Sequence, residues 1–129
     1  MKSSSPKSGT QQFSKTEALL CKPFHNEIAR WETLEDGNIM LEYPLPLKPF
    51  FKAILQKFSK KPIPTPTKKL QLDEMGSQVW TMIDGKRNTK RLIKDFAKNH
   101  NITLQEAETS VTAFLRELGK RGLIGIEQP

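Results

Sequence analysis

A thiol and an imidazole that could form a nucleophile and its base, Cys21 and His25, lie four positions apart. Such a pair becomes catalytic when the base removes the thiol proton and a third group orients the base. No third orienting group stands beside this pair. Cys21 is also the only cysteine, which excludes an internal disulfide and is typical of a reducing compartment. We interpret Cys21 as an inert side chain.

The other residues with catalytic or ligating potential match no known signature. His25 and His100 lie in separate parts of the chain without an acidic cluster beside either, so no metal site is expected. The glycine-rich run 119–125 follows a predicted helix and precedes a strand, whereas a phosphate loop needs the opposite order. Motifs of serine hydrolases, Walker ATPases, zinc proteases and dinucleotide enzymes are missing from the sequence. We therefore predict a binding module with no catalytic site and no cofactor.

The chain has 129 residues, enough for one compact domain. Residues 1–16 contain one aromatic and no aliphatic residue after Met1, so we predict a disordered tail there and a single domain over residues 17–129. The N-terminus lacks the apolar core of a signal peptide, and no run of 18 apolar residues occurs. These features predict a cytoplasmic protein.

The net charge of +7 has its origin in one middle segment, because residues 45–70 contain seven basic and no acidic residues. We interpret the proline-rich part, 45–67, as an insertion in the domain. If residues 49–61 are helical, aromatic and aliphatic side chains gather on one side and lysines on the other. Such a basic amphipathic helix could pack on the domain's own sheet, make peripheral contact with an anionic membrane, or bind a partner protein.

Short strands are predicted in the first half of the domain. Residues 28–44 form a β-hairpin around Asp36 and Gly37, a pair that suits a tight turn. Within it Ile39, Leu41 and Tyr43 recur at the period of a strand. A short third strand, 68–72, follows a proline-spaced run that cannot be helical.

Three helices follow in the second half. The first begins at the N-cap Asp73 and ends near residue 84, the second covers 89–100, and the third begins at the capping box of Thr103 and Glu106. A short strand, 123–126, ends the domain. This order predicts an α+β, winged-helix-like fold with an N-terminal hairpin, a third strand, a three-helix bundle and a C-terminal strand.

A winged helix could bind nucleic acid through its later helix, so the charges on the helices decide between two functions. The third predicted helix exposes Glu106, Glu108 and Glu117, which makes contact with phosphates unfavourable. The second helix and the loop before it carry six basic residues, which either follow a nucleic-acid backbone or form a solvated face: Lys86, Arg87, Lys90, Arg91, Lys94 and Lys98. A nucleic-acid-binding regulator is thus the alternative function.

Three sequence phrases resemble the PqqD family, the peptide chaperones named for coenzyme PQQ synthesis protein D. They are L-D-E-x-G-x-x-V-W at 72–80, I-D-G-x-R at 83–87 and L-x-x-x-G-L-I at 118–124. The resemblance extends over roughly residues 28–127, apart from the insertion 45–67. It implies a recognition element that binds the leader region of a ribosomally made precursor peptide. The peptide is presented to a modifying enzyme, commonly a radical SAM protein.

The resemblance also implies where the peptide binds. In β-augmentation, an unpaired strand edge takes the backbone hydrogen bonds of the peptide, and a neighbouring groove selects its side chains. Carried onto this chain, the edge is Lys69, Leu70, Gln71 and Leu72, and the groove wall is the third helix near Val111 and Leu115. A second interpretation stays open, in which the leucines and Val111 simply face the core. A second copy of the chain could also cover the edge as a homodimer.

Overall fold

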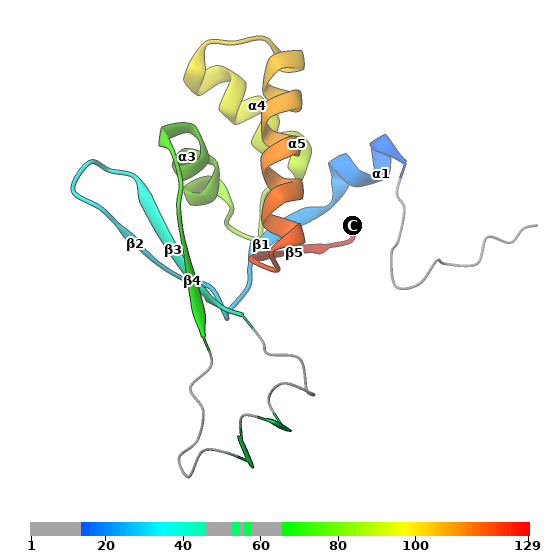
Figure 1. The fold of residues 1–129 in the computed structure, drawn as a ribbon. Helices are drawn as coiled ribbons and strands as arrows, with labels where there is room; N and C mark the ends of the chain where they lie inside the picture. The colour runs from blue at the N-terminus through cyan, green and yellow to red at the C-terminus, as the bar shows by residue number, and fades with distance from the viewer. Residues whose placement is uncertain (1–13, 46–52, 55, 58–65) are drawn as a thin grey trace, which may run out of the picture.

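The computed structural model describes residues 14–45, 53–54, 56–57 and 66–129 (Figure 1). The predicted tail 1–13 and most of the predicted amphipathic helix 49–61 lie outside these residues. The helices and strands follow in the order α1 (Lys15–Leu20), β1 (Lys22–His25), β2 (Arg30–Thr33), β3 (Ile39–Pro44), β4 (Thr67–Gln71), α3 (Glu74–Met82), α4 (Thr89–His100), α5 (Leu104–Lys120) and β5 (Ile124–Glu127). The predicted α+β class and its three main helices are confirmed.

Two small antiparallel sheets support the helices. One has the strand order β2-β3-β4, and the other pairs β1 with β5. The predicted hairpin is confirmed: β2 and β3 flank a turn in which Gly37 takes a positive φ of 88°. The predicted third strand is β4, and it begins one residue earlier than expected. Among the described residues, β4 lies at one edge of the three-stranded sheet.

The helices begin at the residues that their capping patterns predict. The Asp73 side chain accepts a hydrogen bond from the Gly76 N–H, and Asn88 does the same for the third residue of α4. Thr103 and Glu106 form a complete capping box at the start of α5. Each cap satisfies backbone N–H groups that the first helical turn leaves without a partner.

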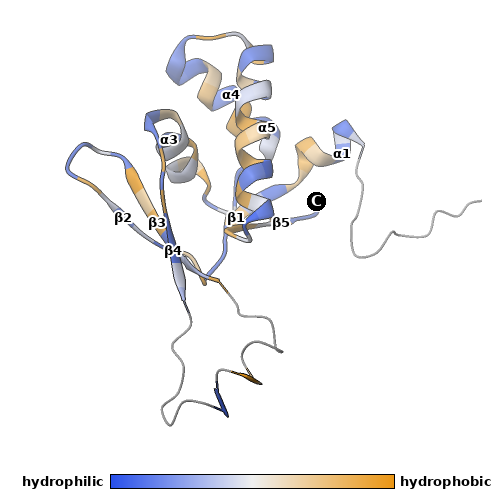
Figure 2. Ribbon diagram, in the orientation of Figure 1, coloured by the Kyte–Doolittle hydropathy of each residue, from blue (hydrophilic) through white to orange (hydrophobic). Residues whose placement is uncertain are grey.

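The core lies between the three-stranded sheet and the helices. Strand β3 alternates buried and half-buried residues, and its buried side chains contribute Ile39, Leu41 and Tyr43 to that core. Trp80 of α3 and Phe96 of α4 are the largest side chains that are fully buried in the described part of the chain. Figure 2 shows hydrophobic residues on β3 and on the neighbouring helices. The strand thus has one face for the core and one for solvent.

Two elements were not predicted. Helix α1 begins at Lys15, capped by Ser14, so it includes residues 15 and 16 of the predicted tail. Strand β1 follows directly and pairs with β5, which attaches the N-terminal part of the domain to its C-terminus. Cys21 lies between α1 and β1, is buried, and donates its thiol hydrogen bond to the Glu17 carbonyl at 3.3 Å. Its position agrees with an inert side chain.

Candidate functional site

The backbone of β4 has an inner and an outer row of hydrogen-bonding groups. The Leu72 N–H donates to the Ile39 carbonyl, and the Leu45 N–H donates to the Pro66 carbonyl, both at 2.8 Å. In an antiparallel pair, such bonded positions alternate with positions that point away from the partner strand. Given the register of β3 and β4, the outward-pointing N–H and C=O groups belong to Thr67, Lys69 and Gln71.

The same alternation separates the four strand residues that the sequence analysis selected. Lys69 and Gln71 are exposed, and their backbone groups lie on the outer edge. Leu70 is opposite Leu41 and half buried, so its side chain belongs to the face that covers the core. Leu72 is only 5% exposed, and its N–H is already used by β3. The structure therefore brings Lys69 and Gln71 to the edge and places Leu72 in the core.

The two residues of α5 that were predicted to form the groove wall, Val111 and Leu115, differ in burial. Val111 is fully buried in the core, whereas Leu115 is half buried and packs against the core from outside. Phe114, which the sequence analysis did not select, is half buried beside Leu115. Phe114 and Leu115 are thus apolar side chains of α5 that remain partly accessible. Helical spacing of the apolar positions was the available signal for Phe114.

A hollow of about 200 Å³ lies beside Phe114, between the start of α3 and the middle of α5. The residue that follows Leu72, Asp73, is in its wall, so the hollow lies just beyond the end of β4. Its lining is largely apolar and consists of Asp73, Met75, Gly76, Val79, Phe96, Ser110 and Phe114. A side chain at Gly76 would not fit, because a Cβ there would stand 2.9 Å from the Phe114 ring. The hollow can accommodate a small apolar side chain.

The opposite end of β4 is cationic. The Arg121 guanidinium, just after α5, donates a hydrogen bond of 3.2 Å to the Tyr43 hydroxyl. Tyr43 is paired in register with Lys68 of β4, which is exposed. Arg121 has Glu117 at 3.9 Å as a distant carboxylate partner. The β4 edge therefore runs from a cationic end at Lys68 to an apolar hollow at Asp73.

The comparisons with known proteins add one match. The model of the family described as Coenzyme PQQ synthesis protein D (PqqD) matches residues 64–124. Residues 64–124 are therefore similar to the PqqD family, and we call them the PqqD segment. The resemblance found in the sequence is confirmed over these residues. No curated protein and no solved structure gave a significant match.

The PqqD segment begins just before β4, contains α3, α4 and α5, and ends at the first residue of β5. All six residues that the sequence analysis selected lie within it. PqqD proteins are non-catalytic peptide chaperones of cofactor and peptide-product biosynthesis, and the match confirms the prediction of a binding protein that is not an enzyme. The family binds precursor peptides and works with a modifying enzyme.

Two further properties concern the described residues alone. Their His, Cys, Asp and Glu side chains form no group of three that could hold a metal ion. None of the helices there has both the length and the apolar character needed to span a membrane.

Proposed function

We propose that this protein binds the leader region of a ribosomally made precursor peptide as an added strand on β4 and presents it to a modifying enzyme. The observation that carries the proposal is the outer row of backbone groups at Thr67, Lys69 and Gln71, within the PqqD segment. Backbone donors and acceptors in such a row give affinity that depends little on the peptide's sequence. No cofactor takes part.

The two ends of the edge supply the sequence preference. Lys68 and Arg121 favour an acidic residue of the leader at the start of β4. The hollow beside Phe114 favours an apolar side chain near the end of β4. In our proposal Leu115 of α5 forms the wall of the peptide groove between the cationic end and the hollow. Val111 does not take part, because it is fully buried. Residues 17–129 act as one domain in this account.

Residues 45–66 lie between β3 and β4 in the chain, and the candidate edge begins at Thr67. Peripheral membrane contact through residues 49–61 stays a prediction, as does a homodimer that would cover the β4 edge.

Purification of the tagged full chain from its native host, followed by mass spectrometry of what elutes with it, tests the proposal. We expect a short ribosomal peptide together with a modifying enzyme. A synthetic copy of that peptide should bind with an affinity that changes only weakly with salt. Recovery of nuclease-sensitive nucleic acid without a peptide, with affinity that falls steeply with salt, would instead support the regulator.

A further inference from the structure

A second surface lies at the start of α4, and we call it the α4 basic surface. It is an open hollow of about 450 Å³. Its lining consists of five cationic residues and one amide, namely Lys86, Arg87, Asn88, Lys90, Arg91 and Lys94. The first turn of α4 contains no acidic residue, so the positive end of the helix dipole adds to the charge of these side chains.

The charge is concentrated here and is not a property of the whole region. Residues 71–129 contain nine basic and eight acidic residues, and five of those nine line this one hollow. Helix α5, in contrast, exposes glutamates such as Glu106 and Glu117. The field of the α4 basic surface is therefore local and directional.

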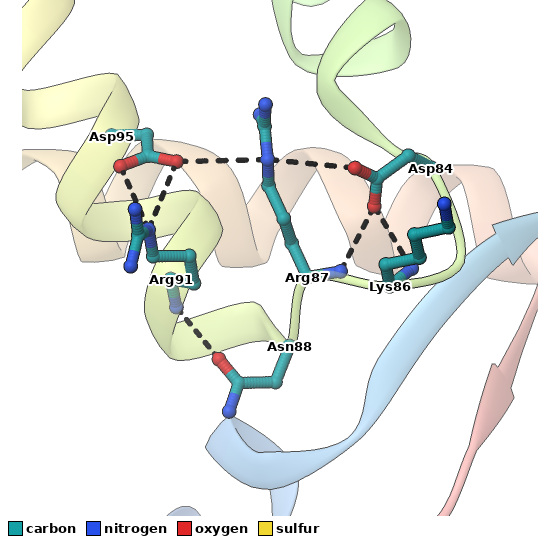
Figure 3. Close-up of polar contacts among 6 residues, drawn as sticks. All are labelled: Asp84, Lys86, Arg87, Asn88, Arg91 and Asp95. Carbon is teal, nitrogen blue, oxygen red and sulfur yellow. Dashed lines mark hydrogen bonds and ion pairs between the residues drawn. The ribbon is translucent and has the colours of Figure 1, made fainter.

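Two carboxylates fix the arginines of the surface (Figure 3). The Arg87 Nε lies 3.6 Å from Asp84 and 3.7 Å from Asp95, and the Arg91 Nε lies 3.2 Å from Asp95. Asp84 also accepts hydrogen bonds of 2.9 Å from the backbone N–H groups of Lys86 and Arg87. These bonds lower the pKa of the Asp84 carboxyl. The loop from Asp84 to Asn88 is thus held by charge-assisted hydrogen bonds.

The lysines differ from the arginines. Lys86, Lys90 and Lys94 are exposed, and they form no ion pair within the part of the chain that the structure describes. Lys90 and Lys94 are four residues apart on α4, so they project from the same side of the helix. The result is a loop held by backbone hydrogen bonds to Asp84, beside three lysines that have no carboxylate partner among the described residues.

The surface is separate from the β4 edge. The Thr89 N–H and hydroxyl both donate to the Cys21 carbonyl, at 2.9 and 3.1 Å, which fixes the start of α4 to the junction of α1 and β1. Figure 3 shows Asn88 beside that junction, and Figure 1 shows β4 on the other side of α5. A ligand on β4 would leave the α4 basic surface accessible.

We infer that the α4 basic surface docks an acidic segment of a second protein, and, resting on the proposed function, that this protein is the enzyme that modifies the bound peptide. A chaperone that presents a peptide needs a contact with the enzyme that the peptide does not occupy. Complementary charge accelerates such an encounter and sets its orientation. Single-stranded DNA and anionic vesicles are the competing occupants that the experiment below separates from an acidic protein segment.

The test uses the full chain and a fluorescein-labelled oligoglutamate peptide as the acidic probe, followed by fluorescence anisotropy. The variant Lys90→Glu/Lys94→Glu reverses two cations of the surface. Lys90 lies in the first turn of α4, where glutamate is compatible with the helix dipole, and Lys94 is exposed, so the fold should be kept. The control Lys98→Glu/Lys120→Glu makes the same change in net charge at exposed positions outside the hollow. Circular dichroism checks that both variants remain folded.

We expect the surface variant to weaken binding of the probe by about tenfold or more, and the control by less than about twofold. Equal weakening by both variants would overturn the inference, because it would show a response to net charge alone. Tighter binding of a single-stranded DNA oligonucleotide or of phosphatidylserine vesicles than of oligoglutamate would also overturn it. The peptide recovered with the protein is titrated against the same variants, and its affinity should not change. If the surface variant loses affinity only for the recovered peptide, the proposed binding of the peptide on β4 is contradicted. If it loses affinity only for oligoglutamate, the separate docking surface is supported.

Discussion

The imidazole ring of His25 lies flat on the indole ring of Trp80, with ring centroids 3.8 Å apart and planes inclined by 9°. The His25 Nε2 also lies 2.9 Å from the Trp80 carbonyl oxygen. Trp31 meets both rings edge-on, at 6.0 and 6.2 Å. These rings belong to β1, β2 and α3, so the cluster joins the two small sheets to the first main helix.

This cluster predicts how stability depends on pH. Burial lowers the pKa of His25 below its ordinary value of 6.5, and the hydrogen bond to the Trp80 carbonyl opposes this only in part. Because the pKa of His25 is lower in the folded protein, His25 of the unfolded chain binds a proton more readily once the pH falls below 6.5. The contribution of His25 is thus complete above pH 6.5 and is lost as the pH falls through the lower pKa of the folded state.

Urea unfolding between about pH 5 and pH 8 measures the effect, since this interval brackets the titration of histidine. His25→Gln keeps an N–H for the Trp80 carbonyl but cannot titrate. We expect the variant to lose most of the decline in unfolding free energy on the acidic side. An identical pH profile in His25→Gln and the unmodified protein would contradict the assignment to His25.

Ser77→Ala should destabilise the fold by about 1–3 kcal/mol. The Ser77 hydroxyl is buried, and it accepts a hydrogen bond from the Ile39 N–H of β3 at 2.8 Å and donates one to the carbonyl of Leu72, just after β4, at 3.4 Å. Alanine would leave the buried N–H without its partner. Thr81→Ala, one turn further along α3 at an exposed position, should change stability by no more than about 0.5 kcal/mol. Urea unfolding compares the two, and equal effects would contradict a bridging role for Ser77.

Gly76→Ala should destabilise the protein by roughly 1 kcal/mol, although alanine favours helices. The new Cβ would stand 2.9 Å from the Phe114 ring and 3.0 Å from the Asp73 carboxylate. Gly119→Ala is the control: nothing lies within 4 Å of its Cβ, so it should stabilise α5 by up to about 1 kcal/mol. The shorter side chain of Phe114→Leu should restore stability to Gly76→Ala in a double-mutant cycle. Additive effects in that cycle would show that the two positions do not interact.

Lys69→Pro should weaken peptide binding by roughly tenfold to hundredfold while the domain stays folded. Proline removes one of the three outward N–H groups of β4 and is tolerated on edge strands, and the inner row that bonds to β3 is unaffected. Lys69→Ala keeps the backbone donor and should bind the peptide nearly as well as the unmodified protein. Titration calorimetry with the recovered peptide measures both affinities. A folded Lys69→Pro protein with full affinity would remove the strand edge from the mechanism.

Local patterns predicted the elements that depend on local chemistry. Helices α3, α4 and α5 follow from the Asp73 cap, the apolar spacing and the Thr103–Glu106 capping box, all of which lie within a few residues. The same S-x-x-E pattern at Ser14 and Glu17 also signals α1. The composition of residues 1–16 predicts a tail and outweighs this short signal.

Contacts between distant segments could not be predicted in this way. Strand β1 has four residues, includes Pro23, and shows no alternation, and it exists because β5 pairs with it. The ring cluster needs β1, β2 and α3 together. At the candidate site, the strand period of β4 was enough to show that Leu70 and Leu72 share a face. Only the hydrogen bonds to β3 reveal that the outer edge belongs to Lys69 and Gln71.

The most direct test of peptide binding on β4 is a backbone N-methyl scan of the recovered peptide, with affinity measured for each synthetic version. An added strand uses the N–H of every second residue, so methylation should weaken binding at alternate positions and be tolerated between them. Loss of one such hydrogen bond corresponds to roughly tenfold to hundredfold in affinity. A run of losses that alternates along the peptide is the result we predict. Uniform tolerance, or losses without alternation, would contradict an added strand.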